Sequence, residues 1–523
     1  MSQQLLSRRL FLGSAAAGAL IPGGLLAELS PPQTPGVAAP DEQIGAAIGR
    51  VDEIVGGIMT RTGVPGIAVA VVHKGETVLA RGYGPRRIGE TAEITPDTVF
   101  QLASVSKSIG ATVVARQVAD GVVTWDARMA DLLPWFELSD PGLKERLTIG
   151  DLYSHRSGLP DHAGDDLEDL GFDRRVILER LRLLPLAAFR SSYAYTNFGL
   201  TAAAEAVSQA AGMDWASLSE QSLYAPLGMG STSSRFADYM GRENRAIPHA
   251  RSGDGFAPLY QRDPDAQSPA GGVSASVSDM AIWMKMVLSG GQHEGAAFIA
   301  GDALLPAISP QSISSPPGSA DARAGFYGYG FNVGVDPSGR VRLSHSGGFD
   351  LGAGTCFSLI PSLDLGIAVL SNAAPIGAVE AIAEIFTELA QLGHERRDWL
   401  AAYQPLFAPF YVPRGRTTGQ SPPVDAGPAL PGDLCIGRYA HPYFGEVEVR
   451  DAGGELVLAA GPEPVLLSLS PWDGATMVFD FVTENAPAGS RSTIEFEVAG
   501  EGPARAVVIE LFGEDGPSRF IRI

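Results

Sequence analysis

The segment Phe100-Gln-Leu-Ala-Ser104-Val-Ser106-Lys107-Ser-Ile-Gly110 places a serine three residues before a lysine. On a helix this spacing puts both side chains on one face, within reach of each other. The residues that follow, Ile109 to Val118, are largely apolar, which predicts a buried helix. A lysine is rarely buried unless it has a specific role, and one such role is the activation of a neighbouring serine. The segment therefore predicts a nucleophilic Ser104 with Lys107 beside it.

Two further motifs follow in the chain. Tyr195-Thr196-Asn197 supplies a phenol and an amide, and His345-Ser346-Gly347-Gly348 lies at the end of a predicted strand. Glycines in a strand allow the backbone of a substrate to approach closely. Taken alone, such a tyrosine is more often a core residue and such a histidine more often a loop residue. Their order and separation after the serine and lysine favour one shared site.

The three motifs resemble those of serine β-lactamases, penicillin-binding peptidases and their esterase relatives. Three flanking phrases are similar to that family as well: Ile94-Thr-Pro-Asp-Thr-Val-Phe100, Leu152-Tyr-Ser-His155-Arg-Ser-Gly-Leu-Pro160 and Pro269-Ala-Gly-Gly-Val-Ser274. The resemblance covers roughly residues 45 to 395 and is specific. More loosely, the C-terminal region resembles the lipocalin-like barrel that is appended to some peptidase-like members.

The resemblance implies an acyl-enzyme on Ser104. It implies that Tyr195 relays the proton, either as a phenolate or through Lys107, and that Asn197 holds the substrate or Lys107. The backbone N–H groups of Ser104 and Gly348 would form the oxyanion hole.

Ser346 and Gly347 are expected to bind substrate. His345 departs from the family pattern, because typical β-lactamases carry a lysine there whose cation helps to receive the carboxylate of the drug. An unperturbed histidine is mostly neutral at pH 7, and lowering the pH toward 6 is expected to charge it and partly restore carboxylate binding.

This departure moves weight from β-lactams to the peptidase-like and esterase-like relatives. The resemblance of the C-terminal region to the barrel of peptidase-like members then favours hydrolysis of amide or peptide bonds in small substrates, including peptides with D-amino acids. A carboxylesterase, a β-lactamase and an acylatable penicillin-binding protein without turnover stay open as alternatives. The chain has no Gly-x-Ser-x-Gly elbow, which argues against an α/β-hydrolase.

The net charge of −21 argues against a nucleic-acid partner. The eight histidines show no metal-ligand spacing, so neither a metal nor another cofactor is expected. Cys356 and Cys435 could form one bridge, but two buried free thiols are favoured. The expected partner is a small molecule or short peptide, and self-association into a homo-oligomer stays open.

The N-terminus carries Ser7-Arg8-Arg9-Leu10-Phe11-Leu12 before an Ala/Gly-rich apolar run. This pattern could be a short helix of the fold, but paired arginines before such a run are typical of a twin-arginine export signal. We expect cleavage near Ala27 or Ala39 and a periplasmic or secreted protein. No later stretch is long and apolar enough to give a stable membrane span.

The order of the predicted elements indicates an α+β fold, an antiparallel sheet flanked by helices. Asp41 is expected to cap a first helix, followed by a hairpin (66–73 and 77–83), helices to about Leu288, strands at 327–335, 341–345, 354–360 and 366–371, and a helix at 376–392. The first and last of these strands should pair. Residues 1–40 would be signal and spacer, 41–408 the hydrolase domain, 409–432 a linker, and 433–523 a small antiparallel β-barrel.

Overall fold

The computed structural model describes residues 37–513 and 518–523 of the 523-residue chain. The predicted export signal lies outside these residues. Across the described ranges, every helix falls short of the length and hydropathy that a bilayer crossing needs.

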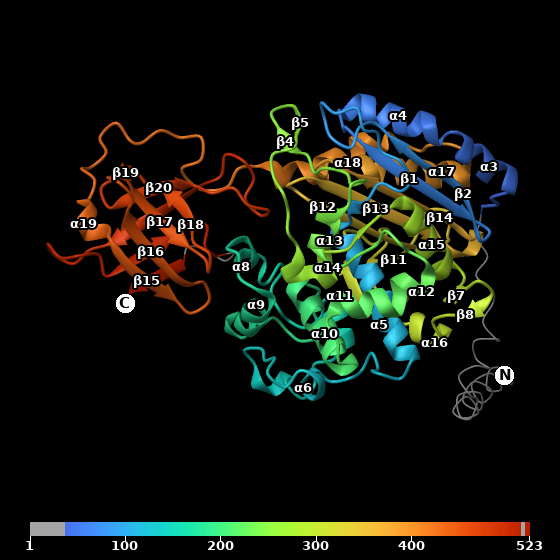
Figure 1. Ribbon diagram of the computed structural model, residues 1–523, viewed down its shortest axis with the longest axis horizontal. Helices are drawn as coiled ribbons and strands as arrows, with labels where there is room; N and C mark the ends of the chain where they lie inside the picture. Colours follow the sequence, from blue (N-terminus) through green and yellow to red (C-terminus); the bar gives the residue numbers. More distant parts are fainter. Residues whose placement is uncertain (1–36, 514–517) are drawn as a thin grey trace, which may run out of the picture.

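An eight-stranded antiparallel sheet forms the centre of the larger domain (Figure 1). The pairing of the first and last segments is as predicted, since Ile67 lies opposite Ser371 in an antiparallel register. The strands follow one another across the sheet as β2 (Glu76–Tyr83), β1 (Ile67–His73), β14 (Leu365–Ser371), β13 (Ala353–Ile360), β12 (Val341–Phe349), β11 (Asn332–Val335), β10 (Gly325–Tyr327) and β9 (Ser312–Ser315).

Helices cover both faces of this sheet, because its central strands are apolar on both sides. Val69 and Val71 of β1 pack against the layer formed by α3 (Asp41–Gly49), α4 (Val51–Thr62), α17 (Ala378–Leu392) and α18 (Trp399–Phe407). The alternate residues Ala68 and Ala70 face the larger helical layer, since side chains alternate along a strand.

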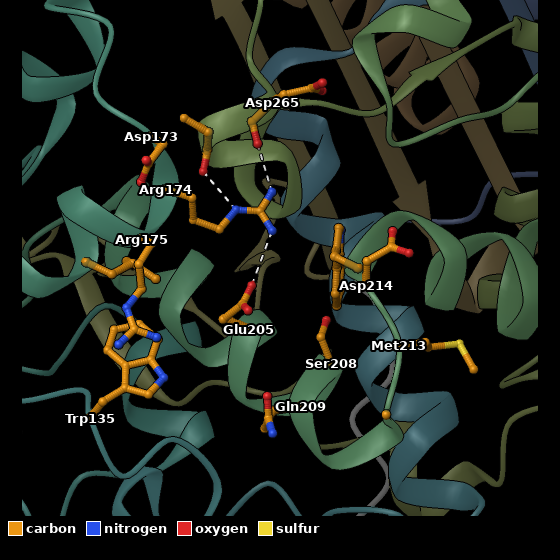
Figure 2. Close-up of a pocket in the computed structure, with 14 residues that line it drawn as sticks. Trp135, Asp173, Arg174, Arg175, Glu205, Ser208, Gln209, Met213, Asp214 and Asp265 are labelled. Atoms are coloured by element: carbon orange, nitrogen blue, oxygen red, sulfur yellow. Dashed lines mark hydrogen bonds and ion pairs between the residues drawn. The ribbon is translucent and has the colours of Figure 1, made fainter. Parts of the chain in front are cut away.

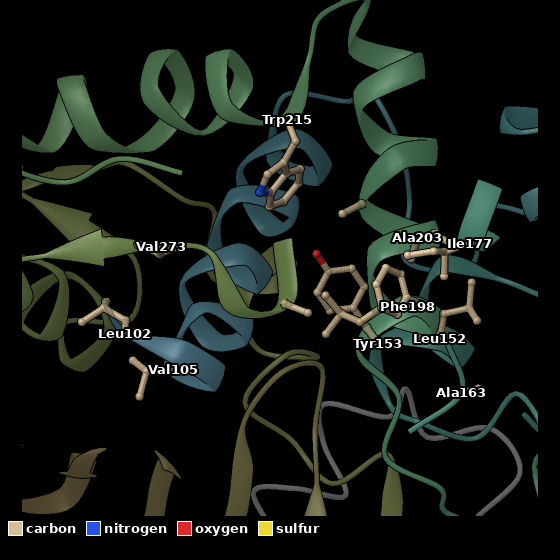
Figure 3. Packing of buried hydrophobic residues seen from close by; sticks show 14 of the residues in the cluster. Leu102, Val105, Leu152, Tyr153, Ala163, Ile177, Phe198, Ala203, Trp215 and Val273 are labelled. Atoms are coloured by element: carbon tan, nitrogen blue, oxygen red, sulfur yellow. The ribbon is translucent and has the colours of Figure 1, made fainter. Parts of the chain in front are cut away.

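The larger layer is built around α5 (Ser106–Ala119), α10 (Asn197–Ala211) and α15 (Val277–Leu288). Figure 3 shows Trp215, Tyr153 and Phe198 packed beside α5 and α10. This packing fixes the helix that carries Lys107. The shorter helices of the domain are α6 (Met129–Leu132), α7 (Ile149–Tyr153), α8 (Asp165–Asp169), α9 (Arg174–Arg180), α11 (Trp215–Ser219), α12 (Ala225–Leu227), α13 (Phe236–Gly241), α14 (Ser268–Gly271) and α16 (Gly301–Leu304).

The start of the domain differs from the prediction. Asp41 is the first residue of α3 rather than its cap, and its carboxylate pairs with Lys74 of the β1–β2 turn. The single helix expected here is two helices, which meet at Arg50.

The single strand expected at 327–335 is also divided, into β10 and β11. Gly330 lies between them with a φ of 76°, a backbone conformation that glycine adopts readily. Its Cα packs so tightly on the Lys107 carbonyl that a side chain could not fit. The strand is interrupted because the segment at Gly330 bends where it packs against the first turn of α5.

The C-terminal region is the predicted antiparallel barrel, with nine strands in a nearly closed sheet. Phe444, Phe479, Phe512 and Phe520 cluster in its core. Cys435, on the short helix α19 (Gly432–Cys435), is buried and unpaired, as is Cys356 in β13. The strands are β15 (Gly437–His441), β16 (Gly445–Asp451), β17 (Leu456–Ala460), β18 (Val465–Ser468), β19 (Ser470–Asp473), β20 (Thr476–Asp480), β21 (Arg491–Glu497), β22 (Ala506–Ile509) and β23 (Ser518–Arg522).

The barrel contacts the larger domain at α8 (Figure 1). The Tyr443 hydroxyl donates to Asp166 at 2.8 Å, and the Thr483 hydroxyl donates to Asp169 at 2.6 Å. Arg180 of α9 donates to the Tyr443 carbonyl at 2.7 Å. The two parts of the chain are therefore joined by specific polar contacts beside α8.

Candidate active site

Ser104 lies in a tight 3-10 turn, Ala103–Val105, that leads directly into α5. Ala103 has a φ of 46°, which is uncommon for a residue with a side chain. Such backbone strain is retained where the surroundings hold it, often at functional sites. The turn is held in this way by the buried residues Leu102 and Val105 on either side of the serine.

Lys107 is fully buried and its ammonium nitrogen meets three oxygen atoms. Nζ lies 3.1 Å from Ser104 Oγ, 2.6 Å from Asn197 Oδ1 and 3.0 Å from the Ala270 carbonyl. Ser104 in the turn and Lys107 in the first turn of α5 are three residues apart, a spacing that brings helical side chains onto one face. The serine and the lysine are therefore in direct contact.

Burial lowers the pKa of Lys107 to about 7, although the charges of Asp165 and Glu168 act in the opposite direction. The neutral amine is consequently well populated near neutral pH. A neutral amine can accept the hydroxyl proton of Ser104, which a permanently charged ammonium cannot.

Tyr195 places its ring 4.6 Å from Lys107 Nζ, just before α10. Burial raises the pKa of the phenol, and this outweighs the opposing effect of the nearby Ser104 hydroxyl. The resting side chain is thus a neutral phenol. Of the two routes that the resemblance implied, relay through Lys107 fits this geometry and a resting phenolate does not.

Asn197, the first residue of α10, connects Lys107 to Asp165. Its Oδ1 accepts from Lys107, and its Nδ2 donates to Asp165 Oδ2 at 2.8 Å. Both ends of the amide are therefore engaged within the protein. This geometry orients the lysine, and of the two roles that the resemblance implied for Asn197 it is the one that these contacts show.

His345 is buried in β12, and both of its ring nitrogens have partners. Nδ1 lies 2.6 Å from the Ser346 carbonyl, so it carries the proton, and Nε2 accepts from the Tyr327 hydroxyl at 2.8 Å. Burial, assisted by the charge of Lys107, lowers the pKa of His345 to about 3. The expectation that His345 gains charge toward pH 6 is therefore wrong, because the ring is desolvated and stands near a cation.

The end of β12 presents an open edge toward Ser104. Strand β11 pairs with β12 only as far as Ser344, so residues 345–349 pair on one side alone, with β13. A side chain at Gly347 would lie 2.9 Å from the Ser104 amide nitrogen, and one at Gly348 would lie 2.8 Å from Pro375. The Ser346 hydroxyl lies near Glu380 of α17. What this segment offers a substrate is mainly its backbone.

His155 and Asp165 belong to this constellation but were not singled out from the sequence. The Thr196 amide donates to His155 Nδ1 at 3.2 Å, and the imidazole packs 4.7 Å from the Tyr195 ring. His155 thus positions the tyrosine. The sequence did contain a signal for His155, because this residue stands in one of the flanking phrases that resemble the family. Ala270, whose carbonyl accepts from Lys107, stands in another.

The two other serines near Lys107 have structural partners. The Val273 amide donates to Ser106 Oγ at 2.9 Å, and Ser108 Oγ donates to the Gly330 carbonyl at 2.5 Å. Both hydroxyls fasten α5 to neighbouring segments. Ser104 is the one of the three that contacts the lysine amine.

A surface cavity of about 770 Å³ lies apart from these residues, between α9 and α10 (Figure 2). Arg174 pairs there with Glu205 at 3.3 Å, and Arg175 lies over the Trp135 ring at 3.5 Å. Ser104, Lys107, Tyr195, Asn197 and His345 are not among the residues that line it. The catalytic candidates lie elsewhere, at the start of α5.

Comparisons with known proteins point to one family. The family model described as Beta-lactamase matches residues 51–391. The unguisins hydrolase of Aspergillus violaceofuscus is 26% identical over 483 residues, which cover 85% of each chain. The D-aminopeptidase of Brucella canis is 26% identical over 300 residues, covering 54% of this chain and 52% of the relative.

Two solved structures share the fold. The octameric penicillin-binding protein homologue from Pyrococcus abyssi aligns with a TM-score of 0.59 at 19% identity, covering 91% of this chain and 100% of that chain. The class C beta lactamase from Rhodobacter sphaeroides aligns with a TM-score of 0.53 at 22% identity, covering 65% and 97%. The family match extends over more than half of the residues, and the chain belongs to the β-lactamase family.

Proposed function

We propose that this protein is a serine hydrolase that forms an acyl-enzyme on Ser104 and hydrolyses amide or peptide bonds in small substrates. One observation carries the proposal: a fully buried lysine, with a pKa of about 7, lies 3.1 Å from the serine hydroxyl. This arrangement supplies a nucleophile together with the base that activates it.

In the first step, the Lys107 amine takes the hydroxyl proton as Ser104 Oγ attacks the carbonyl carbon of the substrate. The N–H groups of Ser104 and Gly348 stabilise the resulting oxyanion. Lys107 then returns the proton, through the Tyr195 phenol, to the leaving nitrogen as the C–N bond breaks. Water subsequently attacks the Ser104 ester, which releases the acid and restores the hydroxyl.

The neutral His345 favours amide or peptide substrates over β-lactam drugs, whose carboxylate it cannot attract by charge. A cation about 4 Å from a carboxylate contributes on the order of 1–4 kcal/mol, depending on the effective dielectric, and this contribution is missing here. The name of the D-aminopeptidase also favours a peptide-like substrate. D-residue peptides are included in the proposed range.

A fluorophosphonate probe followed by peptide mass mapping tests the nucleophile. The label should appear on Ser104, and Ser104→Ala should lose both label and activity. The control is Ser106→Ala, which removes the acceptor for the Val273 amide and should still be labelled. A label on Ser106, or full activity in Ser104→Ala, would refute the assignment.

A panel on one preparation tests the substrate class by comparing kcat/KM for an aminoacyl p-nitroanilide, nitrocefin and p-nitrophenyl butyrate. The proposal requires turnover of the anilide. A much higher kcat/KM for the ester, with no cleavage of the anilide, would identify a carboxylesterase. A clearly higher kcat/KM for nitrocefin would identify a β-lactamase. An acylation burst without turnover would identify a penicillin-binding role.

We also propose that the protein is exported through the twin-arginine signal. Replacing Arg8 and Arg9 by lysine keeps the charge and should leave precursor in the cytoplasm. Unchanged export of that variant, measured by fractionation, would contradict the proposal.

A further inference from the structure

A second cavity, of about 490 Å³, lies between the catalytic domain and the barrel. One wall comes from the segment around α8 and from Asp350, and the other comes from barrel residues that include Phe481 and Glu484. Neither part of the chain forms this cavity alone. The barrel therefore shapes a space that the catalytic domain by itself would leave open.

The cavity adjoins the catalytic residues on two sides. Asp165, which lines it, accepts from the same Asn197 that holds Lys107. Asp350, which also lines it, comes directly after Phe349, the last residue of β12. A substrate acylating Ser104 and lying along the open edge of β12 can therefore extend into this space.

Acidic side chains outnumber basic ones in the lining of this cavity. Six carboxylic acids and one arginine, Arg414, are among its lining residues; the acids are Asp161, Asp165, Asp166, Asp169, Asp350 and Glu484. Several of them are already satisfied, since Glu484 accepts from the Asp350 and Leu351 amides. Burial raises the pKa values of Asp166, Asp169, Asp350 and Glu484, and a bound cation would stabilise their charged forms.

Two of these carboxyl groups have oxygen atoms that could still accept a hydrogen bond. The Asp350 carboxylate has no hydrogen bond or ion pair among the described residues, and burial raises its pKa to about 7 despite the charge of Arg414. Asp165 is 4% exposed, and its Oδ1 atom is buried without a hydrogen-bond partner in the described part of the chain. Both observations point to a ligand that supplies positive charge or N–H donors.

Aromatic rings complete the wall. Phe410, Phe444, Phe481 and Phe512 line the same cavity, and the rings of Phe481 and Phe512 lie 5.6 Å apart. The face of an aromatic ring attracts a cation, and its area favours an apolar ligand body. Carboxylates and phenylalanines together suit an organic cation better than a hydrated metal ion, which prefers oxygen ligands alone.

We propose that this cavity is a substrate subsite, built jointly by the catalytic domain and the barrel, for a positively charged group carried on an apolar or aromatic body. The inference rests on the proposed acyl-enzyme chemistry and names the substrates that it favours. Asp350, whose carboxylate has no hydrogen bond or ion pair among the described residues, and Asp161, an exposed acid that lines the same cavity, are the carboxylates that we assign to the charge. Asp165 stays engaged with Asn197. The phenylalanines receive the body of the ligand.

Two acyl p-nitroanilides that differ in charge but not in length test the subsite. The ω-aminohexanoyl compound ends in an ammonium group, and the heptanoyl compound ends in a methyl group of similar size. We expect kcat/KM for the cationic compound to exceed that for the neutral one by about tenfold or more. Phenethylammonium should likewise inhibit more strongly than phenethyl alcohol.

Asp350→Asn should reduce the cationic-to-neutral ratio of kcat/KM by about tenfold, toward unity. Asp161→Asn, at an exposed position, gives the same test with little risk to folding. The control is Asp364→Asn, in the β13–β14 turn, which removes one charge where φ is 44° and asparagine is well tolerated. It should leave the ratio unchanged.

Fluorophosphonate labelling of Ser104 separates failure of this inference from failure of the proposed function. Equal kcat/KM for the two anilides in a protein that labels normally would overturn the subsite alone. Unchanged ratios in both Asp350→Asn and Asp161→Asn would overturn the assigned residues. Loss of labelling in the unmodified protein would instead refute the acyl-enzyme.

Discussion

In the proposed mechanism Lys107 is the base, and its protonation should set the pH dependence of the reaction. Because burial lowers its pKa to about 7, the amine is protonated and inactive below that pH and free above it. We expect kcat/KM to rise as pH increases through about 7 and then to level. Since kcat/KM reports ionisations of the free enzyme, a pH profile with a p-nitrophenyl ester measures this directly.

Lys107→Arg keeps the positive charge but removes the titration. It should lower the acylation rate by about 10²-fold or more, which is the scale of general-base catalysis. Lys285→Arg in α15 makes the same exchange away from the serine and should have no effect. If kcat/KM of the Lys107→Arg variant still rose as the pH increased through about 7, another group would be the base.

His345 should show no titration in the same range. Its pKa of about 3 means that the ring stays neutral between pH 5 and pH 8. We therefore expect the discrimination against nitrocefin, measured as its kcat/KM relative to that of p-nitrophenyl butyrate, to remain constant over this range. A gain for nitrocefin near pH 6 that disappears in His345→Gln would mean that the imidazole does become charged.

Among the elements, the 3-10 turn before α5 carries a measurable strain. A residue with a Cβ in the left-handed region costs about 1–2 kcal/mol, whereas glycine adopts it readily. Ala103→Gly should thus lower the free energy of unfolding by less than Ala115→Gly, which loses a buried methyl from ordinary helix. Urea unfolding of the two variants measures the difference, and equal losses would show that the turn is unstrained.

The periodic elements were predictable because their patterns are local. Alternation and apolar runs located β1, β13, β14 and α17 to within a few residues. The motifs also named Ser104, Lys107 and Tyr195, which lie together in the structure. The features that could not be predicted from the sequence depend on contacts between residues that are distant along the chain. The break between β10 and β11 depends on Gly330 meeting α5, and the pKa of His345 depends on burial beside Lys107.

The barrel strands illustrate the same limit. β15 and β19 are short, and each is defined by its pairing partners more than by its own composition. The cavity that joins barrel and hydrolase domain was not foreseeable either. Its residues come from segments more than 300 positions apart along the chain.

At the scale of the whole molecule, Asp169 joins the two domains. Its Oδ2 accepts from the Thr483 hydroxyl at 2.6 Å, from Asn485 Nδ2 at 3.0 Å and from the Asn485 amide at 3.3 Å. Asp169→Asn should weaken this contact by about 1–3 kcal/mol, because the partners lose a charged acceptor. Hydrogen exchange measured by mass spectrometry should then become faster in the segment 481–486.

The control for this prediction is Asp173→Asn. Asp173 caps α9 by accepting from the Val176 amide, and asparagine serves equally well there. Exchange in the barrel should not change in this variant. Unaltered exchange in Asp169→Asn as well would show that the barrel is held by its other contacts.

The tight packing of Gly347 on the nucleophile turn has a consequence for how this enzyme can diversify. A side chain there would collide with Leu102 and Ser104, so a mutational scan should find the position intolerant of every other residue, whatever the substrate. The neighbouring edge of β12 acts through its backbone, which point mutation does not alter. New specificities must therefore arise on the loops around α8 and on the barrel, where substitutions leave the nucleophile in place.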